Sequence, residues 1–333
     1  MNNAARLTNV DVLRGFASLA VCWFHLTNTY IDNSLVRLSG HYGWLGVEVF
    51  FVISGFVIPY AMLRSNYTFR TDWLKFVVKR SLRIEPPYLI SIALMLILWH
   101  ASAMAPNFNG APAPAILSAK TLLHLGYLNG VMGYEWLSPV FWTLAIEFQF
   151  YLLLSIYFFV LQNSNPFIVL AGNVLLIGAS LLFTLDTLVF KYLGIFVMGI
   201  AAFQYRTNIF SSQILLLCLM LAACAVAAGL GLTIATIGFL TSIVLAFDVD
   251  LGRHKFALWL GEISFSLYLV HVPIGGRVVN LGRRYVESQI GELVLSAVAM
   301  MVCLIAAHLF YLTIERPSRR LAAGIKYSRP EVQ

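Results

Sequence analysis

The chain has 333 residues, of which 60% are hydrophobic and 11% are charged, and its mean hydropathy is +0.81. An ordinary soluble domain has about a quarter charged residues, so this composition excludes a water-soluble globular protein. The formal net charge of +7 comes from basic residues in short segments between apolar stretches. That pattern is typical of membrane topology and argues against nucleic-acid binding.

Ten stretches have about the 20 apolar residues with which a helix crosses a membrane. They predict one all-α transmembrane domain, a bundle of about ten helices. The stretches are roughly 10–30, 44–63, 87–104, 137–161, 166–183, 187–205, 211–228, 230–247, 256–277 and 290–314. An even number of spans with both termini in the cytoplasm puts most Lys and Arg residues on the cytoplasmic side, as topology requires. The first span is expected to stay in the mature protein.

Two ionisable residues mark the first span, Arg14 and His25. A charged side chain costs roughly 2.5 to 3.5 kcal/mol at the centre of a span, so it needs a partner, a cavity or a chemical task. Arg14 and His25 are eleven residues apart, about three helical turns, so they face the same way. Asp11 could neutralise Arg14 as a helical ion pair. For Arg14, two interpretations therefore remain: an ion pair with Asp11, or the binding of a ligand.

The second span carries Glu48 in an apolar run, with glycines that favour close helix packing. The inner segment that follows holds Lys79, Arg80 and Arg83 before Pro86. Arg80 and Arg83 can project from one face of a helix end, where guanidinium groups bind phosphate through bidentate bonds. Ordinary positive-inside topology accounts for the same residues and, for this pair taken alone, is the favoured interpretation.

The longest outer segment, 105–136, is rich in Pro, Gly and Asn and has a possible short helix near 117–128. Ordered loops of this length tend to be functional.

The fourth and ninth spans also carry polar side chains. Glu147 lies in the outer half of the fourth span, with Tyr151 one turn away. In the ninth span, Ser264, Tyr268 and His271 follow i, i+4, i+7 spacing. His271 lies about as deep as the histidine of the first span. One such histidine is as often structural as catalytic, but two at one depth, with two glutamates available, favour a reactive cavity.

The four cysteines lie in predicted spans without metal-type spacing and are expected to be small buried residues. We predict neither a structural disulfide nor a metal site. The cysteines are Cys22, Cys218, Cys224 and Cys303.

Six short motifs occur in order along nearly the whole chain. They are Arg14-Gly15 with His25, the FFVISGF run at 50–56, Arg80 and Arg83 before Pro86, the block from Trp142 to Glu147 with Phe150-Tyr151, the block from Gly261 to His271, and Glu315-Arg316-Pro317. In these motifs the chain resembles the acyltransferase-3 family of bacterial membrane proteins, which acylate sugars of surface polysaccharides and related acceptors. Thr143 and Phe265 stand where the resemblance leads us to expect Ser and Tyr.

The resemblance implies an acyl-CoA donor, expected to be acetyl-CoA, on the cytoplasmic side of the bacterial inner membrane. The acceptor is then a hydroxyl of a lipid-linked or surface carbohydrate, such as lipopolysaccharide, at the outer side. It also implies an essential Arg and His pair in the first span. The candidate catalytic residues are His25, Glu147, Glu48 and His271. The candidates for holding the coenzyme are Arg14, Arg80, Arg83 and Lys79, and those for binding substrate are Trp142, Tyr151, Ser264 and Tyr268.

His25 is the first choice as general base, because a histidine titrates near neutral pH and sugar hydroxyls are poor nucleophiles without a base. An acyl-histidine intermediate is the second choice. A macrolide-like small molecule acylated from the cytoplasmic side is an alternative acceptor. A secondary transporter or proton-coupled carrier would also explain buried His and Glu in Gly-broken spans. However, the two halves of the chain show no correspondence that would indicate an inverted repeat.

Overall fold

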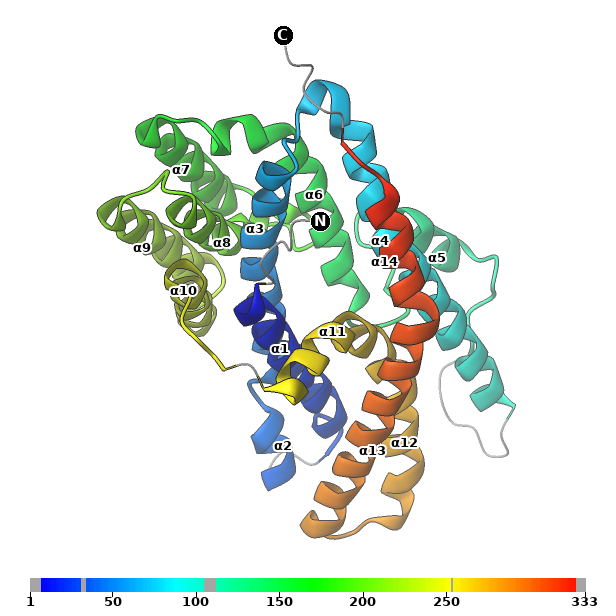
Figure 1. The fold of residues 1–333 in the computed structure, drawn as a ribbon. Coiled ribbons are helices and arrows are strands. Elements are labelled where there is room, and N and C mark those ends of the chain that lie inside the picture. The colour runs from blue at the N-terminus through cyan, green and yellow to red at the C-terminus, as the bar shows by residue number, and fades with distance from the viewer. Residues whose placement is uncertain (1–6, 31–33, 105–111, 253, 328–333) are drawn as a thin grey trace.

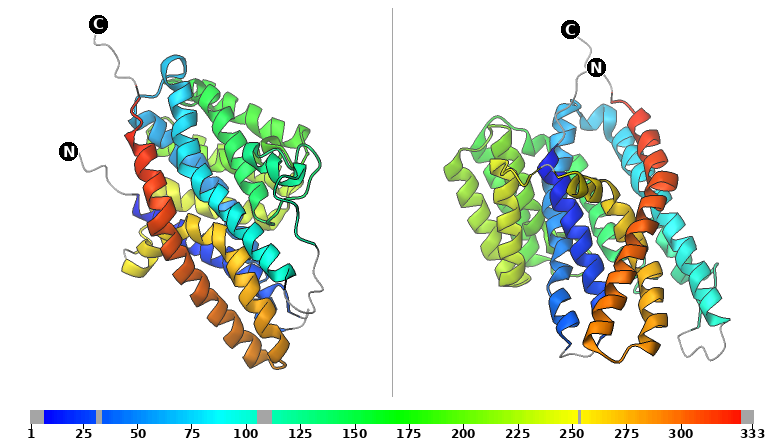
Figure 2. Two further views of the ribbon diagram at one scale, coloured as in Figure 1. Left: turned by 90° about the vertical axis from the view of Figure 1, so that its right-hand side faces the viewer. Right: turned by 60° about the horizontal axis from the view of Figure 1, so that its bottom comes forward.

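The computed structural model describes residues 7–30, 34–104, 112–252 and 254–327, and Figures 1 and 2 show a bundle of helices. These residues contain no strand, so the predicted all-α class is confirmed for the described part of the chain. The helices are α1 (Thr8–Thr27), α2 (Leu35–Gly40), α3 (Gly46–Arg64), α4 (Phe69–Ala103), α5 (Ala119–Leu122), α6 (Phe141–Leu161), α7 (Pro166–Leu182), α8 (Leu193–Arg206), α9 (Ser212–Gly229), α10 (Leu232–Phe247), α11 (Lys255–Val270), α12 (Gly276–Gly282), α13 (Gln289–Phe310) and α14 (Arg316–Gly324).

Seven helical stretches in the described ranges are long and apolar enough to cross a membrane. They are Thr8–Thr27, Leu35–Arg64, Phe69–Ala103, Phe141–Leu161, Ser212–Gly229, Lys255–Tyr285 and Gln289–Gly324. Helices occupy all ten predicted stretches, but α7, α8 and α10 have only 17, 14 and 16 residues. The predicted number of about ten crossings is therefore not confirmed by helix length.

Helix α4 differs most from its prediction, because it begins at Phe69 and not near Pro87. The helix continues through Pro86 and Pro87. Proline usually ends a helix in water, but inside a membrane protein neighbouring groups can satisfy the backbone groups that it frees. The basic residues before Pro86 consequently lie within a long helix, whose first half packs beside α14 (Figures 1 and 2).

Glycines allow α1 and α11 to pack backbone against backbone. A Cβ atom at Gly15 would lie 2.8 Å from the Cβ of Leu260, and one at Gly261 would overlap the carbonyl oxygen of Asp11. Further along both helices, the rings of His25 and His271 have centroids 5.2 Å apart. Because contacts advance in the same order along α1 and α11, the two helices run in the same direction. This packing brings the candidate residues of the first and ninth predicted spans together.

Contacts also define the relative directions of α3, α4 and α6. Ser54 of α3 contacts Glu147 of α6, and Tyr67 just after α3 contacts Ser155, so α3 and α6 run in the same direction. Helix α4 runs opposite to α6, because Arg80 lies over Tyr151 whereas Tyr88, later in α4, packs on Phe141 at the start of α6. These directions are those expected if the predicted spans cross the membrane in alternation.

The glycines of the second predicted span are packing residues, as the sequence predicts. Cβ atoms at Gly43 and Gly46 would overlap carbonyl oxygens of α1, and one at Gly55 would overlap the carbonyl oxygen of Phe196 in α8. Helix α3 therefore packs closely between α1 and α8. The side chain of Ser54 in α3 points toward α6.

Candidate active site

One cavity lies between α1, α3, α4, α6, α11 and the turn at the end of α13. We call it the arginine cavity. Its walls are apolar except for nine polar or charged side chains: Arg14, Ser54, Arg80, Arg83, Thr143, Glu147, Tyr151, Tyr268 and Glu315. Apolar walls with a few converging polar groups are typical of sites for small molecules and cofactors.

Two of the three arginines of this cavity have unused hydrogen-bonding capacity. The Nε atoms of Arg14 and Arg80 are buried and have no partner among the described residues. The guanidinium group of Arg80 lies 5.4 Å from the ring centroids of both Phe76 and Tyr151. Arg14 and Arg80 both repel Arg83, so three cations gather here, and none of them forms an ion pair with a carboxylate within the described ranges. Such a cluster suits a polyanion such as phosphate.

The two carboxylates of the cavity bond to groups other than its three arginines. Glu147 accepts hydrogen bonds from the Ser54 hydroxyl at 2.8 Å and the Tyr151 hydroxyl at 2.5 Å. Glu315 accepts from the amide and hydroxyl of Ser266 at 3.1 and 2.6 Å and lies 3.7 Å from Arg319. Within the described ranges, neither carboxylate forms an ion pair with an arginine of the cavity. Among the ion pairs described for these ranges, none joins Asp11 to Arg14.

Tyr268 links the cavity to the two histidines. Its hydroxyl lies 2.7 Å from that of Thr143 and donates to the carbonyl of Val140 at 3.2 Å. Its ring centroid lies 5.9 Å from that of His271, which in turn lies 5.2 Å from that of His25. The residue at 143 thus supplies a hydroxyl to Tyr268 although it is not the expected Ser.

His271 has a defined orientation. Its Nδ1 atom lies 3.0 Å from the carbonyl oxygen of Leu267, which can only accept, so Nδ1 carries the hydrogen. Its Nε2 atom is buried without a partner among the described side chains. A single π-helical turn at His271–Gly275 follows α11 at this point, and such turns are frequent at functional sites. Neither His271 nor the half-buried His25 forms part of the cavity wall.

Six of the residues predicted from the sequence line the arginine cavity: Arg14, Arg80, Arg83, Glu147, Tyr151 and Tyr268. Four others lie apart from it. Glu48 is buried in α3, and its Oε2 atom has no partner among the residues that the structure describes. Lys79 donates to the carbonyl of Ile325 at 3.3 Å. The Ser264 hydroxyl donates back to the carbonyl of Gly261 at 2.9 Å, and Trp142 lines a second cavity.

Three of the nine polar or charged cavity residues were not predicted as site residues. Ser54 and Thr143 are hydroxyl residues in apolar runs, and nothing in their spacing distinguishes them from hydroxyls that bond within their own helix. Glu315 carried a usable signal, since it is an acidic residue at the end of an apolar stretch. In the described ranges, no group of three or more His, Cys, Asp or Glu side chains is arranged to hold a metal ion.

Comparison with known proteins places this geometry in context. Residues 7–312 match the model of a family described as an acyltransferase domain. The chain is 30% identical to O-acetyltransferase OatA of Staphylococcus aureus (strain NCTC 8325 / PS 47) over 166 residues, which are 48% of the chain and 26% of that protein.

Two further relatives come from other sources. The chain is 30% identical to the putative acetyltransferase ORF330 of Acidianus two-tailed virus over 166 residues, 49% of the chain and 44% of that protein. It is 31% identical to nodulation protein 10 of Rhizobium leguminosarum bv. viciae over 176 residues, 46% of the chain and 44% of that protein. These matches span less than half the length of each relative. No solved structure matches.

Proposed function

The chain belongs to the acyltransferase-3 family, and from that premise we propose that it transfers an acetyl group from acetyl-CoA to a hydroxyl of a carbohydrate acceptor. The acetyltransferase names of its relatives support the chemistry of the transferred group. One observation carries the proposal. A cavity inside an apolar helix bundle holds three arginines without ion pairs in the described ranges, next to a pair of histidines.

The coenzyme occupies the arginine cavity in this proposal. Arg14, Arg80 and Arg83 bind its phosphates through charge-assisted hydrogen bonds. Its pantetheine arm runs toward Tyr268, and so places the thioester near His25 and His271. Lys79 donates a hydrogen bond to the carbonyl of Ile325 outside this cavity, and in this proposal it does not bind the donor.

The donor enters from the cytoplasm in this proposal. All ten apolar helices cross the bacterial inner membrane, with α7, α8 and α10 shortened, and both termini lie in the cytoplasm. The relative directions of α1 and α11, and of α3, α4 and α6, which follow from their contacts, fit this alternation. The basic residues between α3 and Pro86 then face the cytoplasm, as the positive-inside rule requires. His25 lies near the other end of α1 and faces the acceptor on the outer side.

The reaction forms one carbon–oxygen bond and breaks one carbon–sulfur bond. The acceptor oxygen attacks the thioester carbonyl, and His25 takes the hydroxyl proton. The carbon–sulfur bond then breaks, and the thiolate leaves as coenzyme A after taking up that proton. Glu147 acts by holding the hydroxyls of Ser54 and Tyr151, which keeps Tyr151 under Arg80. The total charge of the products equals that of the reactants.

Consumption of acetyl-CoA tests the enzyme against a carrier. The purified protein in detergent is expected to release free coenzyme A thiol from acetyl-CoA slowly with water as acceptor, and faster with a carbohydrate acceptor. A thiol reagent follows the release, and heat-denatured protein is the control. A transporter would leave the thioester intact, so no release above the denatured control argues for that class.

A further inference from the structure

A second cavity lies beside the arginine cavity, and aromatic side chains form much of its wall. We call it the aromatic cavity. Four rings line it, together with one carboxylate and one hydroxyl: Tyr127, Trp136, Trp142, Tyr192, Asp186 and Thr187. They come from three parts of the chain: segment 127–136, helix α6 and segment 186–192.

Helix α6 separates the two cavities. Trp142 and Ile146 face the aromatic cavity, whereas Thr143 and Glu147 face the arginine cavity. Phe51 connects the walls of the two cavities. It lines the arginine cavity, and its ring contacts that of Trp142 in the aromatic cavity, with centroids 6.3 Å apart. A molecule in the aromatic cavity therefore lies next to the proposed reaction site but outside it.

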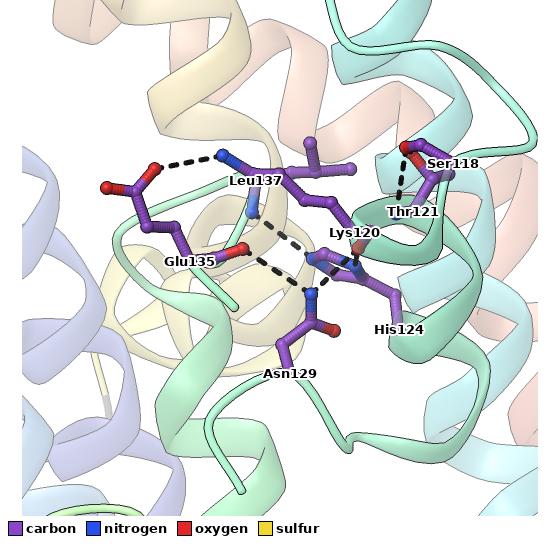
Figure 3. Close-up of polar contacts among 7 residues, drawn as sticks. All are labelled: Ser118, Lys120, Thr121, His124, Asn129, Glu135 and Leu137. Carbon is purple, nitrogen blue, oxygen red and sulfur yellow. Dashed lines mark hydrogen bonds and ion pairs between the residues drawn. The ribbon is translucent and has the colours of Figure 1, made fainter. Parts of the chain in front are cut away.

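A polar network holds the first wall segment in place (Figure 3). The ring of His124 bonds the carbonyl of Lys120 at 2.8 Å through Nδ1 and accepts from the amide of Leu137 at 3.2 Å through Nε2. Asn129 donates to the same carbonyl at 2.7 Å, and Lys120 pairs with Glu135 at 3.0 Å. Burial lowers the pKa of His124, so its neutral ring keeps one donor and one acceptor.

The other wall segment is fixed to α6 by Gln149. Its amide donates to the carbonyl of Thr187 at 3.0 Å and accepts from the amide of Val189 at 2.8 Å. The two segments meet at Gly130, where a Cβ atom would lie 3.1 Å from the side chain of Thr187. Fixed segments hold the rings in place before any ligand arrives, as an effective binding site requires.

Two polar features point to a ligand with hydroxyl groups. Thr187 supplies a hydroxyl to the cavity wall. Asp186 is at the exposed rim and pairs with Lys191, which offers an acceptor and a donor side by side. Sugars combine apolar C–H faces, which pack on aromatic rings, with hydroxyls that need such partners.

We infer that the aromatic cavity binds one saccharide unit of the acceptor, adjacent in the acceptor chain to the unit that is acylated. The inference rests on the proposed function, which supplies a carbohydrate acceptor. Under the proposed topology the cavity opens near the outer ends of α6 and α8, the end at which His25 lies. The site thus holds an oligosaccharide while a neighbouring unit reaches the histidines.

A glycan array and a calorimetric titration test this inference together. Purified, labelled protein is passed over a printed array of defined bacterial tri- to hexasaccharides, and acetyl-CoA is titrated into the same preparations. We expect retention of the unchanged protein on at least one glycan class. Trp136→Ala should reduce that retention at least about tenfold, because it removes a ring from the pocket wall. Trp136→Phe, which keeps a smaller ring, should fall between the two.

One further variant tests the cavity in a second way, and another is a control at a distant surface position. Gly130→Val adds volume between the wall segments without removing a contact of the loop network, and should weaken retention as well. Trp73→Ala removes an indole from the exposed surface of α4 and should be retained like the unchanged protein. All four variants should bind acetyl-CoA with an unchanged dissociation constant.

The outcomes separate this inference from the proposed function. Retention on no glycan, or equal retention of Trp136→Ala and the unchanged protein, overturns the saccharide site even if acetyl-CoA binds. Trp136-dependent glycan retention without any acetyl-CoA binding supports the saccharide site and contradicts the proposed donor.

Discussion

Replacing His25 with alanine is expected to cut acyl transfer by roughly 10² to 10⁴, the usual contribution of a positioned base, while the helix bundle stays folded. His25 is half-buried near the end of α1, next to His271, and Tyr268 connects this pair to the arginine cavity. The coenzyme phosphates are held elsewhere in the proposal, so acetyl-CoA binding should be nearly normal. The effect should therefore fall on kcat.

A packing role for His25 makes the opposite forecast. Alanine would then lower the yield or thermal stability of the protein, and each folded molecule would still turn over near the normal rate. His25→Gln separates the two roles further, since Gln keeps hydrogen bonding and approximate volume but cannot accept a proton at neutral pH. His100→Gln, the same change at the exposed end of α4, is the matched control.

The result for His25→Gln also decides between the two histidines. If this variant keeps more than about a tenth of the normal turnover, His25 is not the base. His271 then becomes the candidate, because its Nε2 atom is a buried acceptor without a partner among the described groups. The same assay on His271→Gln would show the loss that His25→Gln failed to show.

Changing Arg80 and Arg83 together to glutamine should lower the affinity for acetyl-CoA at least tenfold. Each charge-assisted contact to a phosphate contributes roughly 1.5 to 3 kcal/mol, and the double change removes two of them. Both arginines line the cavity, and the Arg80 Nε atom has no partner among the described residues. Isothermal titration with acetyl-CoA on purified protein measures the effect.

The control for the arginine pair is Arg64→Gln with Arg70→Gln. It removes the same charge from the same inner part of the chain, but both residues are exposed and outside the cavity. This control should bind acetyl-CoA normally. If the Arg80 and Arg83 double variant inserts in the correct orientation and also binds normally, these residues serve topology alone, as the positive-inside interpretation holds.

Much of the cavity could be predicted from the sequence, because an ionisable group in an apolar run needs a physical reason. Arg14 and Glu147 stand out in this way, and both line the arginine cavity. Helical spacing put Tyr268 and Ser264 on one polar stripe, but Tyr268 lines the cavity whereas the shorter Ser264 bonds the carbonyl of Gly261 in its own helix. Spacing defines a direction from the helix axis, and side-chain length decides what is reached.

Other parts of the structure had no such signal. The length of α4 was underestimated because Pro86 and Pro87 indicate a helix start in water, and the packed bundle overrides that tendency. The aromatic cavity combines residues from segment 127–136, α6 and segment 186–192. No periodicity connects these segments, so their meeting is a property of tertiary structure alone.

The most direct test of the account is a structure of the protein in lipid nanodiscs with coenzyme A bound. We predict density for the phosphates within hydrogen-bonding distance of Arg14, Arg80 and Arg83, with the thiol end directed toward Tyr268. Coenzyme bound elsewhere on the protein, or an arginine cavity without coenzyme at a saturating concentration, would contradict the assignment of this cavity as the donor site.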